Sequence, residues 1–157
     1  MDQIPAAAVD AILKAGNEAP VGTGAFPTIH FTVIQNADLI KKISDAATRG
    51  TPRAGADIFY GAPTVILVSA AEQPFPGLDL ADAGSIIQNF LLAATDLGLG
   101  SVYIFGSNAA FAAEPELLKE AGIPEGFKPV SSAAIGYATA EATAAPKAPR
   151  NIPVNRV

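Results

Sequence analysis

Residues 62–70 read Ala62-Pro63-Thr64-Val65-Ile66-Leu67-Val68-Ser69-Ala70, near the middle of a chain of 157 residues. Apolar side chains occupy successive positions of this stretch, so both faces of a strand formed here are apolar. A strand of this kind lies in the middle of a sheet that is covered on both sides. The sequence therefore predicts a central sheet with helices packed against both of its faces.

Strands and helices alternate on either side of this segment. Runs of β-branched and aromatic residues predict strands, and apolar residues that recur every three or four positions predict helices. The predicted strands are residues 28–35, 101–105 and 130–137. The predicted helices are residues 4–15, a segment that Asn36 caps, residues 80–97 and turns within residues 114–121. This alternation is typical of an α/β or α+β fold with a sheet between helical layers.

The composition indicates a single domain, residues 1–157, that associates with other copies of itself. Half of the residues are apolar, 16% are charged, and the mean hydropathy is +0.32. With so few charged residues, this mean hydropathy is high for a soluble monomer of this size, so another subunit is expected to cover part of the apolar surface. We therefore expect a homo-oligomer.

Residues 138–157 differ from the rest of the chain, because they show no amphipathic period. From Lys147 onward the segment carries Lys147, Arg150 and Arg156 and no acidic residue. A segment of this kind is either disordered or laid as an arm on a partner. We favour the arm, which would place basic and β-branched side chains against another subunit.

Composition also excludes several classes of protein. No run approaches the roughly 18 to 20 apolar residues of a membrane span, and the N-terminus lacks the regions of a signal peptide. We therefore expect a cytoplasmic protein that does not bind membranes. With no cysteine and one histidine, disulfides, thiolate nucleophiles and Cys/His metal sites are not expected. The net charge of −5 and the pI near 4.7 argue against nucleic-acid binding.

The side chains offer no complete catalytic group of their own. His30, the one histidine, lies within a predicted strand, where a structural role is expected. The acidic residues are scattered, and no two of them form an evident acid–base pair. If the protein is an enzyme, the reactive group is therefore expected to come from a cofactor.

Two glycine pairs, in residues 22–24 and 98–100, each lie between a predicted helix and the following strand. A dinucleotide-binding fingerprint has the reverse order, in which a strand precedes the glycine turn and a helix follows it. The P-loop pattern G-x-x-x-x-G-K-[ST] does not occur in the sequence. The glycines therefore support neither a Rossmann-type nucleotide site nor a P-loop.

Six segments follow one another in a recognisable order and spacing. They are Ala15-Gly16-Asn17-Glu18-Ala19-Pro20 with the glycine loop and the strand His30-Phe31-Thr32-Val33, then Gly61-Ala62-Pro63-Thr64-Val65-Ile66, then Ile87-Gln88-Asn89-Phe90-Leu91-Leu92-Ala93-Ala94, then Leu97-Gly98-Leu99-Gly100, then Gly122-Ile123-Pro124-Glu125-Gly126-Phe127, and finally Ala134-Ile135-Gly136-Tyr137. Together they resemble the FMN-dependent nitroreductase family over residues 4–157, in a short form.

The resemblance implies a fold, an assembly and an activity. The fold is α+β, a three-layer sandwich with a central, mostly antiparallel sheet flanked by helices. The assembly is an intertwined homodimer with two FMN sites at the subunit interface. Family members take a hydride from NADH or NADPH and pass it to nitroaromatics, quinones or similar small electron-poor acceptors. The alternative is a non-catalytic flavin-binding or interaction module of the same fold, with weak FMN binding or none.

The resemblance also implies where the flavin ring lies. In the family, the segment after the long helix offers backbone N–H groups to flavin N5, and here it is Ile104-Phe105-Gly106-Ser107. A glycine at this point lets a flat ring approach closely. The loop Pro20-Val21-Gly22-Thr23-Gly24 corresponds to the family segment that borders the flavin, often from the other subunit. For both segments, an ordinary connecting turn is the alternative.

The FMN phosphate is the point at which this sequence departs from the family. The family's N-terminal R-x-S-x-R motif has no counterpart here, since no arginine precedes Lys14. A doubly negative phosphate is bound weakly without charge-assisted hydrogen bonds. Lys147 and Arg150 are the remaining candidates, because family members also reach the phosphate from the C-terminal arm. Solvated tail charges are the alternative.

Three further residues are candidates for contacts with the flavin or with the substrate. Arg53, in the Gly- and Pro-rich loop of residues 48–57, could stabilise negative charge at flavin N1 and O2, or be a plain surface arginine. Phe26 and Phe75 could form walls of the substrate pocket, although core packing explains Phe26 equally well.

Overall fold

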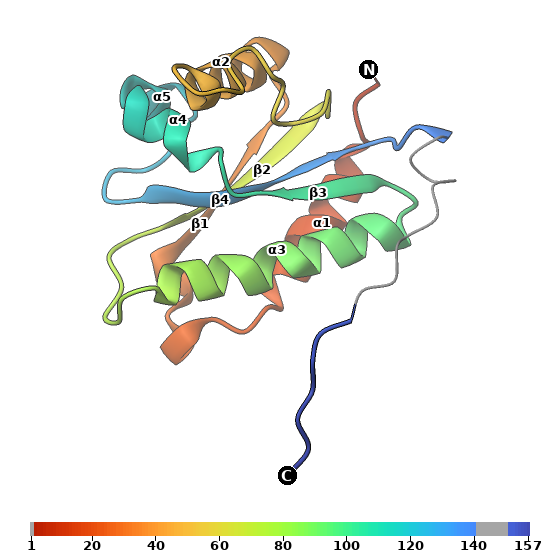
Figure 1. The fold of residues 1–157 in the computed structure, drawn as a ribbon, viewed down its shortest axis with the longest axis vertical. Helices are drawn as coiled ribbons and strands as arrows, with labels where there is room; N and C mark the ends of the chain where they lie inside the picture. The colour runs from red at the N-terminus through yellow and green to blue at the C-terminus, as the bar shows by residue number, and fades with distance from the viewer. Residues whose placement is uncertain (1, 141–150) are drawn as a thin grey trace.

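The sheet and its helices form three layers, with α2, α4 and α5 on one face and α1 and α3 on the other (Figure 1). The computed structural model describes residues 2–140 and 151–157. These residues form an antiparallel sheet in the strand order β1-β2-β4-β3. The strands are β1 (Ile29–Ile34), β2 (Thr64–Ala70), β3 (Gly100–Ile104) and β4 (Lys128–Gly136). The helices are α1 (Ala6–Asn17), α2 (Ala37–Thr48), α3 (Leu78–Asp96), α4 (Asn108–Ala113) and α5 (Glu116–Glu120), and the 3-10 helices are η1 (Gly22–Gly24) and η2 (Phe26–Thr28).

β2 is an interior strand of the sheet, as its sequence predicts. All of its residues are buried, and their side chains alternate between the two layers. Ile66 and Val68 pack in the core beneath α1 and α3, whereas Val65 and Leu67 pack in the core beneath α2 and α4. The strand begins at Thr64 rather than at residue 62, because a proline at residue 63 has no N–H to donate within a sheet.

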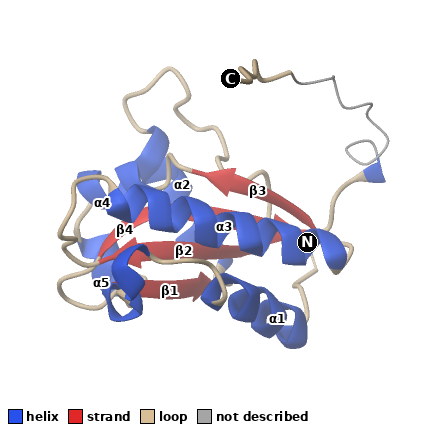
Figure 2. Ribbon diagram, turned by 90° about the horizontal axis from the view of Figure 1, so that it is seen from below, coloured by secondary structure: helices blue, strands red, loops and turns tan. Residues whose placement is uncertain are grey.

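The helices α1 and α3 lie side by side on their face of the sheet (Figure 2). Phe90 of α3 is fully buried, and its ring packs edge-on against Phe31 with ring centroids 5.2 Å apart. Gly16 of α1 lies so near that a Cβ placed there would stand 2.1 Å from Phe90 Cε1. Only a residue without a side chain allows this approach of α1 to the ring.

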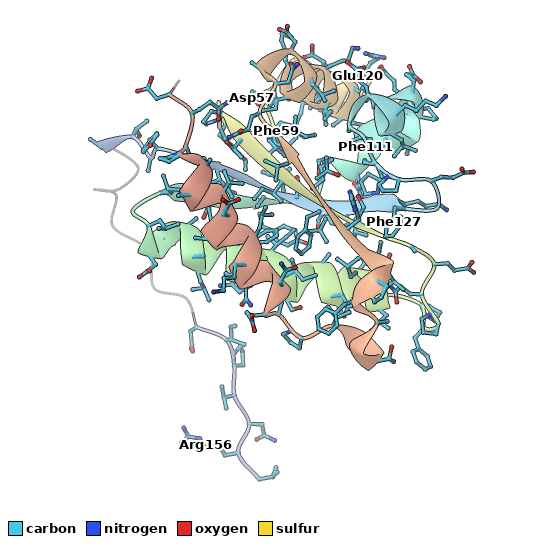
Figure 3. The ribbon with its side chains drawn as sticks, turned by 180° about the vertical axis from the view of Figure 1, so that it is seen from behind. Asp57, Phe59, Phe111, Glu120, Phe127 and Arg156 are labelled. Atoms are coloured by element: carbon cyan, nitrogen blue, oxygen red, sulfur yellow. The ribbon has the colours of Figure 1, made fainter. Side chains whose placement is uncertain are left out.

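The other face carries α2, α4 and α5. Asn36 caps α2 as predicted, because its Oδ1 accepts a hydrogen bond of 3.0 Å from the Leu39 N–H. The core of this layer includes the side chains of Phe59 and Phe111 (Figure 3). α4, which carries Phe111, packs against α2 and β4 on this face.

α4 is an element that the sequence pattern does not predict. Residues 108–113 read Asn-Ala-Ala-Phe-Ala-Ala, and alanine is the strongest helix former, but six residues are too few to show a helical period. α5 lies within the predicted turns of residues 114–121. The Lys42 ammonium of α2 donates to Glu120 Oε2 of α5 at 2.7 Å, and this hydrogen bond raises the pKa of Lys42.

Residues 151–157 lie at the end of the predicted arm. They form neither helix nor strand, and Ile152 and Val154 are 82% and 78% exposed (Figure 1). Within residues 2–140 and 151–157, every helix is too short or too polar to cross a lipid bilayer. The same residues contain no group of three His, Cys, Asp or Glu side chains arranged to hold a metal ion.

Candidate functional site

The turn from β3 into α4 exposes backbone donors. Phe105 is 54% exposed and Gly106 is exposed, while the N–H groups of both residues donate no hydrogen bond within the described chain. A Cβ placed on Gly106 would meet no atom within 4 Å, and the φ angle of this residue is not in the left-handed region. Nothing in the described fold therefore requires glycine at residue 106. What glycine provides at this position is room above two free N–H groups.

The residues on either side of these donors point inward. Ile104 belongs to the core under α2 and α4, and Ser107 is fully buried. The Ser107 hydroxyl lies 2.8 Å from the Ser132 hydroxyl, which donates to the Ile104 carbonyl at 3.2 Å. The side chains of Ile104 and Ser107 thus hold the turn in place, and Phe105 and Gly106 form its exposed surface.

The loop of residues 20–24 is fastened to α3. The Gly22 N–H donates to Asp82 Oδ1 at 2.8 Å, and the Ser85 hydroxyl donates to the Pro20 carbonyl at 3.0 Å. Val21 packs against the core beneath α1 and α3, whereas Pro20, Thr23 and Gly24 are exposed. The loop therefore presents a small, exposed surface from a fixed position.

Phe26 follows this loop in η2, and Phe75 lies in the segment just before α3. They are 52% and 60% exposed, and Phe75 lines a cavity of about 530 Å³ together with Gln73 and Lys128. The Gln73 amide donates to the Thr28 hydroxyl at 2.6 Å, which joins the segment that carries Phe75 to the one that carries Phe26. The segments that carry Phe26 and Phe75 thus both lie near the start of α3, but no residue of 20–26 lines the cavity of Phe75.

Arg53 lies on the other side of the sheet from this group. Its loop is attached to α2, where the Ser44 hydroxyl donates to the Ala56 carbonyl at 3.2 Å and accepts from the Ile58 N–H at 3.0 Å. α2 and α3 cover opposite faces of the sheet (Figure 1). One chain therefore does not bring Arg53 and residues 20–24 into one pocket. Lys147 and Arg150, the candidates for the phosphate, lie outside the described residues.

Two residues that hold the loop are not predicted from the sequence. Asp82 and Ser85 belong to α3, the long helix with an apolar stripe in its sequence. A polar residue within that stripe is the feature from which their role could have been predicted. Asp82 lies four residues after Leu78 and four before Ile86, so it falls on the buried face. Asn89, a further polar residue of this helix, bonds within the fold, because its amide donates to the Ala15 carbonyl at 2.9 Å.

His30 has a contact of a structural kind. It is half-buried, and its ring centroid lies 5.6 Å from that of Phe127 at an interplanar angle of 57°. In the sheet, His30 lies directly opposite Ser69 of β2, but no hydrogen bond joins the two side chains within the described residues, and the imidazole packs against Phe127.

Comparisons with known proteins place these features in a family. The model of the nitroreductase family matches residues 1–137 of this chain. A protein of Archaeoglobus fulgidus, whose name assigns it provisionally as an NADH dehydrogenase/NAD(P)H nitroreductase, is 33% identical over 134 residues, which cover 82% of this chain and 71% of that protein. A similarly named protein of Methanothermobacter thermautotrophicus is 31% identical over 103 residues, or 64% of this chain and 50% of that protein.

Solved structures agree with the sequence comparisons. A nitroreductase with bound FMN from Bacteroides fragilis superimposes with a TM-score of 0.79 at 27% identity, over 99% of this chain and 88% of that one. A nitroreductase with bound FMN from Desulfitobacterium hafniense gives a TM-score of 0.82 at 25% identity, over 99% of this chain and 89% of that one. With a family model that covers residues 1–137 and a fold shared over nearly its whole length, this chain belongs to the nitroreductase family.

Proposed function

We propose that the protein is an FMN-dependent NAD(P)H oxidoreductase that reduces nitroaromatics, quinones or similar small electron-poor acceptors. Membership of the nitroreductase family, the FMN-bound neighbours and the names of the two relatives support this function. When bound, FMN supplies the hydride chemistry, accepting from NADH or NADPH and delivering to the acceptor. The protein's own residues then bind and orient the ring and keep water from it.

The observation that carries the proposal is the exposed turn at Phe105 and Gly106. Its two free N–H groups can donate to an acceptor nitrogen or oxygen at the rim of a flat ring, and the space above Gly106 admits that ring. The buried hydroxyls of Ser107 and Ser132 hold the turn, so the donors are in position before the ligand arrives.

The other candidates complete the site in this proposal. The loop of residues 20–24 borders the ring, and Phe26 and Phe75 form apolar walls for the acceptor. Arg53 stabilises negative charge on the reduced ring. Lys147 and Arg150 neutralise the phosphate through charge-assisted hydrogen bonds.

A homodimer is part of the same proposal. Arg53 and residues 20–24 lie on opposite sides of one chain's sheet, so a second subunit is needed for both to border one ring. β3 is an edge strand of the described sheet, and its Val102 and Tyr103 side chains are partly exposed. Other exposed apolar side chains available for an interface are Tyr60, Leu80, Leu92, Leu97 and Tyr137.

The function is tested on the purified chain of residues 1–157. We expect flavin absorption bands after incubation with FMN and gel filtration, and we expect these bands to bleach when NADH or NADPH is added without oxygen. Sedimentation or light scattering should give twice the monomer mass of 15.9 kDa. A colourless protein that takes up no FMN would refute the oxidoreductase and leave the non-catalytic module.

A pair of variants tests the role of the turn. Gly106→Leu fills the space above the free N–H groups without a backbone penalty, so FMN affinity should fall at least tenfold while the melting temperature without FMN is unchanged. Ala112→Leu, which adds similar bulk at an exposed position of α4, is the matched control and should bind FMN like the parent. Equal FMN affinity in both variants would place the ring elsewhere.

A further inference from the structure

We propose that Asp82 is a positioning residue of the flavin site, whose buried carboxylate fixes the loop of residues 20–24 in the conformation that borders the ring. The inference rests on the proposed function, because that function assigns the loop to the ring. It concerns a residue of α3 that is 4% exposed and therefore acts through the loop rather than by touching the ligand.

One row of side chains on α3 contacts the segment that leads from the end of α1 to the loop of residues 20–24. Leu78, Asp82, Ser85 and Asn89 are spaced four, three and four residues apart, which places all of them on one face of the helix. Asn89 bonds to the Ala15 carbonyl, Ser85 to the Pro20 carbonyl and Asp82 to the Gly22 N–H. The row thus follows the backbone of residues 15–22 in the antiparallel direction, and Asp82 holds the point nearest to the exposed tip.

The backbone just beyond this point needs an external support. Thr23 has a φ angle of +56°, in the left-handed region that a β-branched residue seldom adopts, and Gly24 follows with +69°. Gly22 itself lies close to α3, since a Cβ there would stand 2.3 Å from Leu78 Cδ1. A strained residue persists only where its surroundings determine it, and the bond from Gly22 to Asp82 lies directly before the strained Thr23, whereas Gly24 adopts its positive φ without strain.

Burial of the Asp82 carboxylate is also unfavourable in free energy. Oδ1 accepts the hydrogen bond of Gly22, but Oδ2 is buried and has no hydrogen-bond partner within residues 2–140 and 151–157. A buried carboxylate with an unpartnered oxygen is unfavourable compared with an apolar side chain of similar size. Packing of α3 against its neighbours alone does not account for an acid at residue 82. A charged acceptor for the Gly22 N–H does, because such hydrogen bonds are the strong ones.

Three variants separate positioning from packing. Asp82→Asn keeps an acceptor oxygen for the Gly22 N–H, whereas Asp82→Leu keeps the branched shape of the side chain and removes the acceptor. Asp96→Ala removes an exposed acid from the last turn of the same helix and is the matched control. Circular dichroism and thermal melting first establish that each variant folds, and Asp82→Ala replaces Asp82→Leu if the latter does not.

Two measurements on these variants test the inference. Hydrogen exchange of the peptide that contains residues 20–24, measured without FMN, should be at least tenfold faster in Asp82→Leu, less accelerated in Asp82→Asn, which keeps a neutral acceptor, and at the parental rate in Asp96→Ala. FMN dissociation constants, measured by quenching of flavin fluorescence, should rise about tenfold or more in Asp82→Leu, where the charge-assisted hydrogen bond is lost without replacement, and less in Asp82→Asn. Partial rescue by the asparagine distinguishes positioning of the loop from a general loss of packing.

The outcomes distinguish this inference from the function on which it rests. A parent protein that binds no FMN refutes the proposed function, and the exchange rates then decide whether Asp82 holds the loop. Parental exchange of residues 20–24 in a folded Asp82→Leu variant overturns the inference. Faster exchange with unchanged FMN affinity also overturns it, because the loop conformation would then not matter to the ligand.

Discussion

The contact between Gly16 and Phe90 gives the sharpest test of the packing. The substitution is Gly16→Ala, which adds one methyl group to α1. That methyl group would stand 2.1 Å from Phe90 Cε1 and 2.9 Å from both Cδ1 and Cζ, whereas carbon atoms in contact are normally about 3.5 to 4 Å apart. The ring or the helix must therefore move by more than about 1 Å.

The magnitude follows from two opposing effects. Overpacking a filled core costs about 1 to 3 kcal/mol, and the upper end applies because the Phe90 ring is fully buried and pressed against Phe31. Replacing glycine by alanine within a helix regains about 1 kcal/mol. We expect a net loss of about 2 kcal/mol, or a melting temperature lower by about 4 to 8 °C for a domain of this size.

The assay is urea unfolding followed by circular dichroism, at fixed protein and FMN concentrations, since both binding and association shift apparent stability. A double-mutant cycle with Phe90→Leu provides the control, because shortening the ring should make Gly16→Ala neutral or stabilising in that background. A Gly16→Ala protein at least as stable as the parent, or an equal loss in both backgrounds, would show that α1 does not approach the ring as described.

Other predictions concern single contacts of the fold. Asn36→Ala removes the cap of α2 and should cost about 1 kcal/mol in urea unfolding, while an unchanged midpoint would contradict the capping bond. Leu67→Ala, at a fully buried position of β2, should cost about 2 to 5 kcal/mol, and a smaller loss would place β2 nearer the surface. Glu120→Ala removes the bond that raises the pKa of Lys42, so an NMR titration should find this pKa shifted back toward 10.5. Because the pKa is raised in the folded state, the pair stabilises the fold fully below pH 10.5 and loses this contribution as the pH rises through the folded-state pKa.

The elements of the fold were predictable where a periodic pattern is long. The apolar run of residues 62–70 predicts a doubly covered strand, and residues 80–97 predict the long helix, because both patterns reflect burial along a regular element. α4 escapes prediction for the opposite reason, since its residues 108–113 are shorter than two helical turns. The strand order places β4 between β2 and β3, and this non-sequential arrangement depends on contacts that no local pattern encodes.

The residues of the candidate site were also predictable only in part. Gly106 stands out in the sequence by its place after a short strand, and the structure adds what the sequence lacks, namely the open space and the free N–H groups. The roles of Asp82 and Ser85 depend on a loop some 60 residues earlier in the chain, with the Gly22–Asp82 bond spanning 60 positions. The role proposed for Arg53 could not be predicted from one chain. Arg53 and residues 20–24 lie on opposite sides of one sheet, so in the proposed site they border the same ring only when they come from two copies of the chain.

The open margin of β3 has a consequence for handling the protein. An edge strand with apolar side chains is a template on which other extended chains can pair, and such edges drive aggregation unless they are covered. Val102 and Tyr103 provide those side chains, and β3 carries no lysine, arginine or proline to prevent the pairing. The solubility of this chain therefore depends on whatever covers β3, and dilution or truncation that uncovers the strand will favour precipitation over a stable monomer.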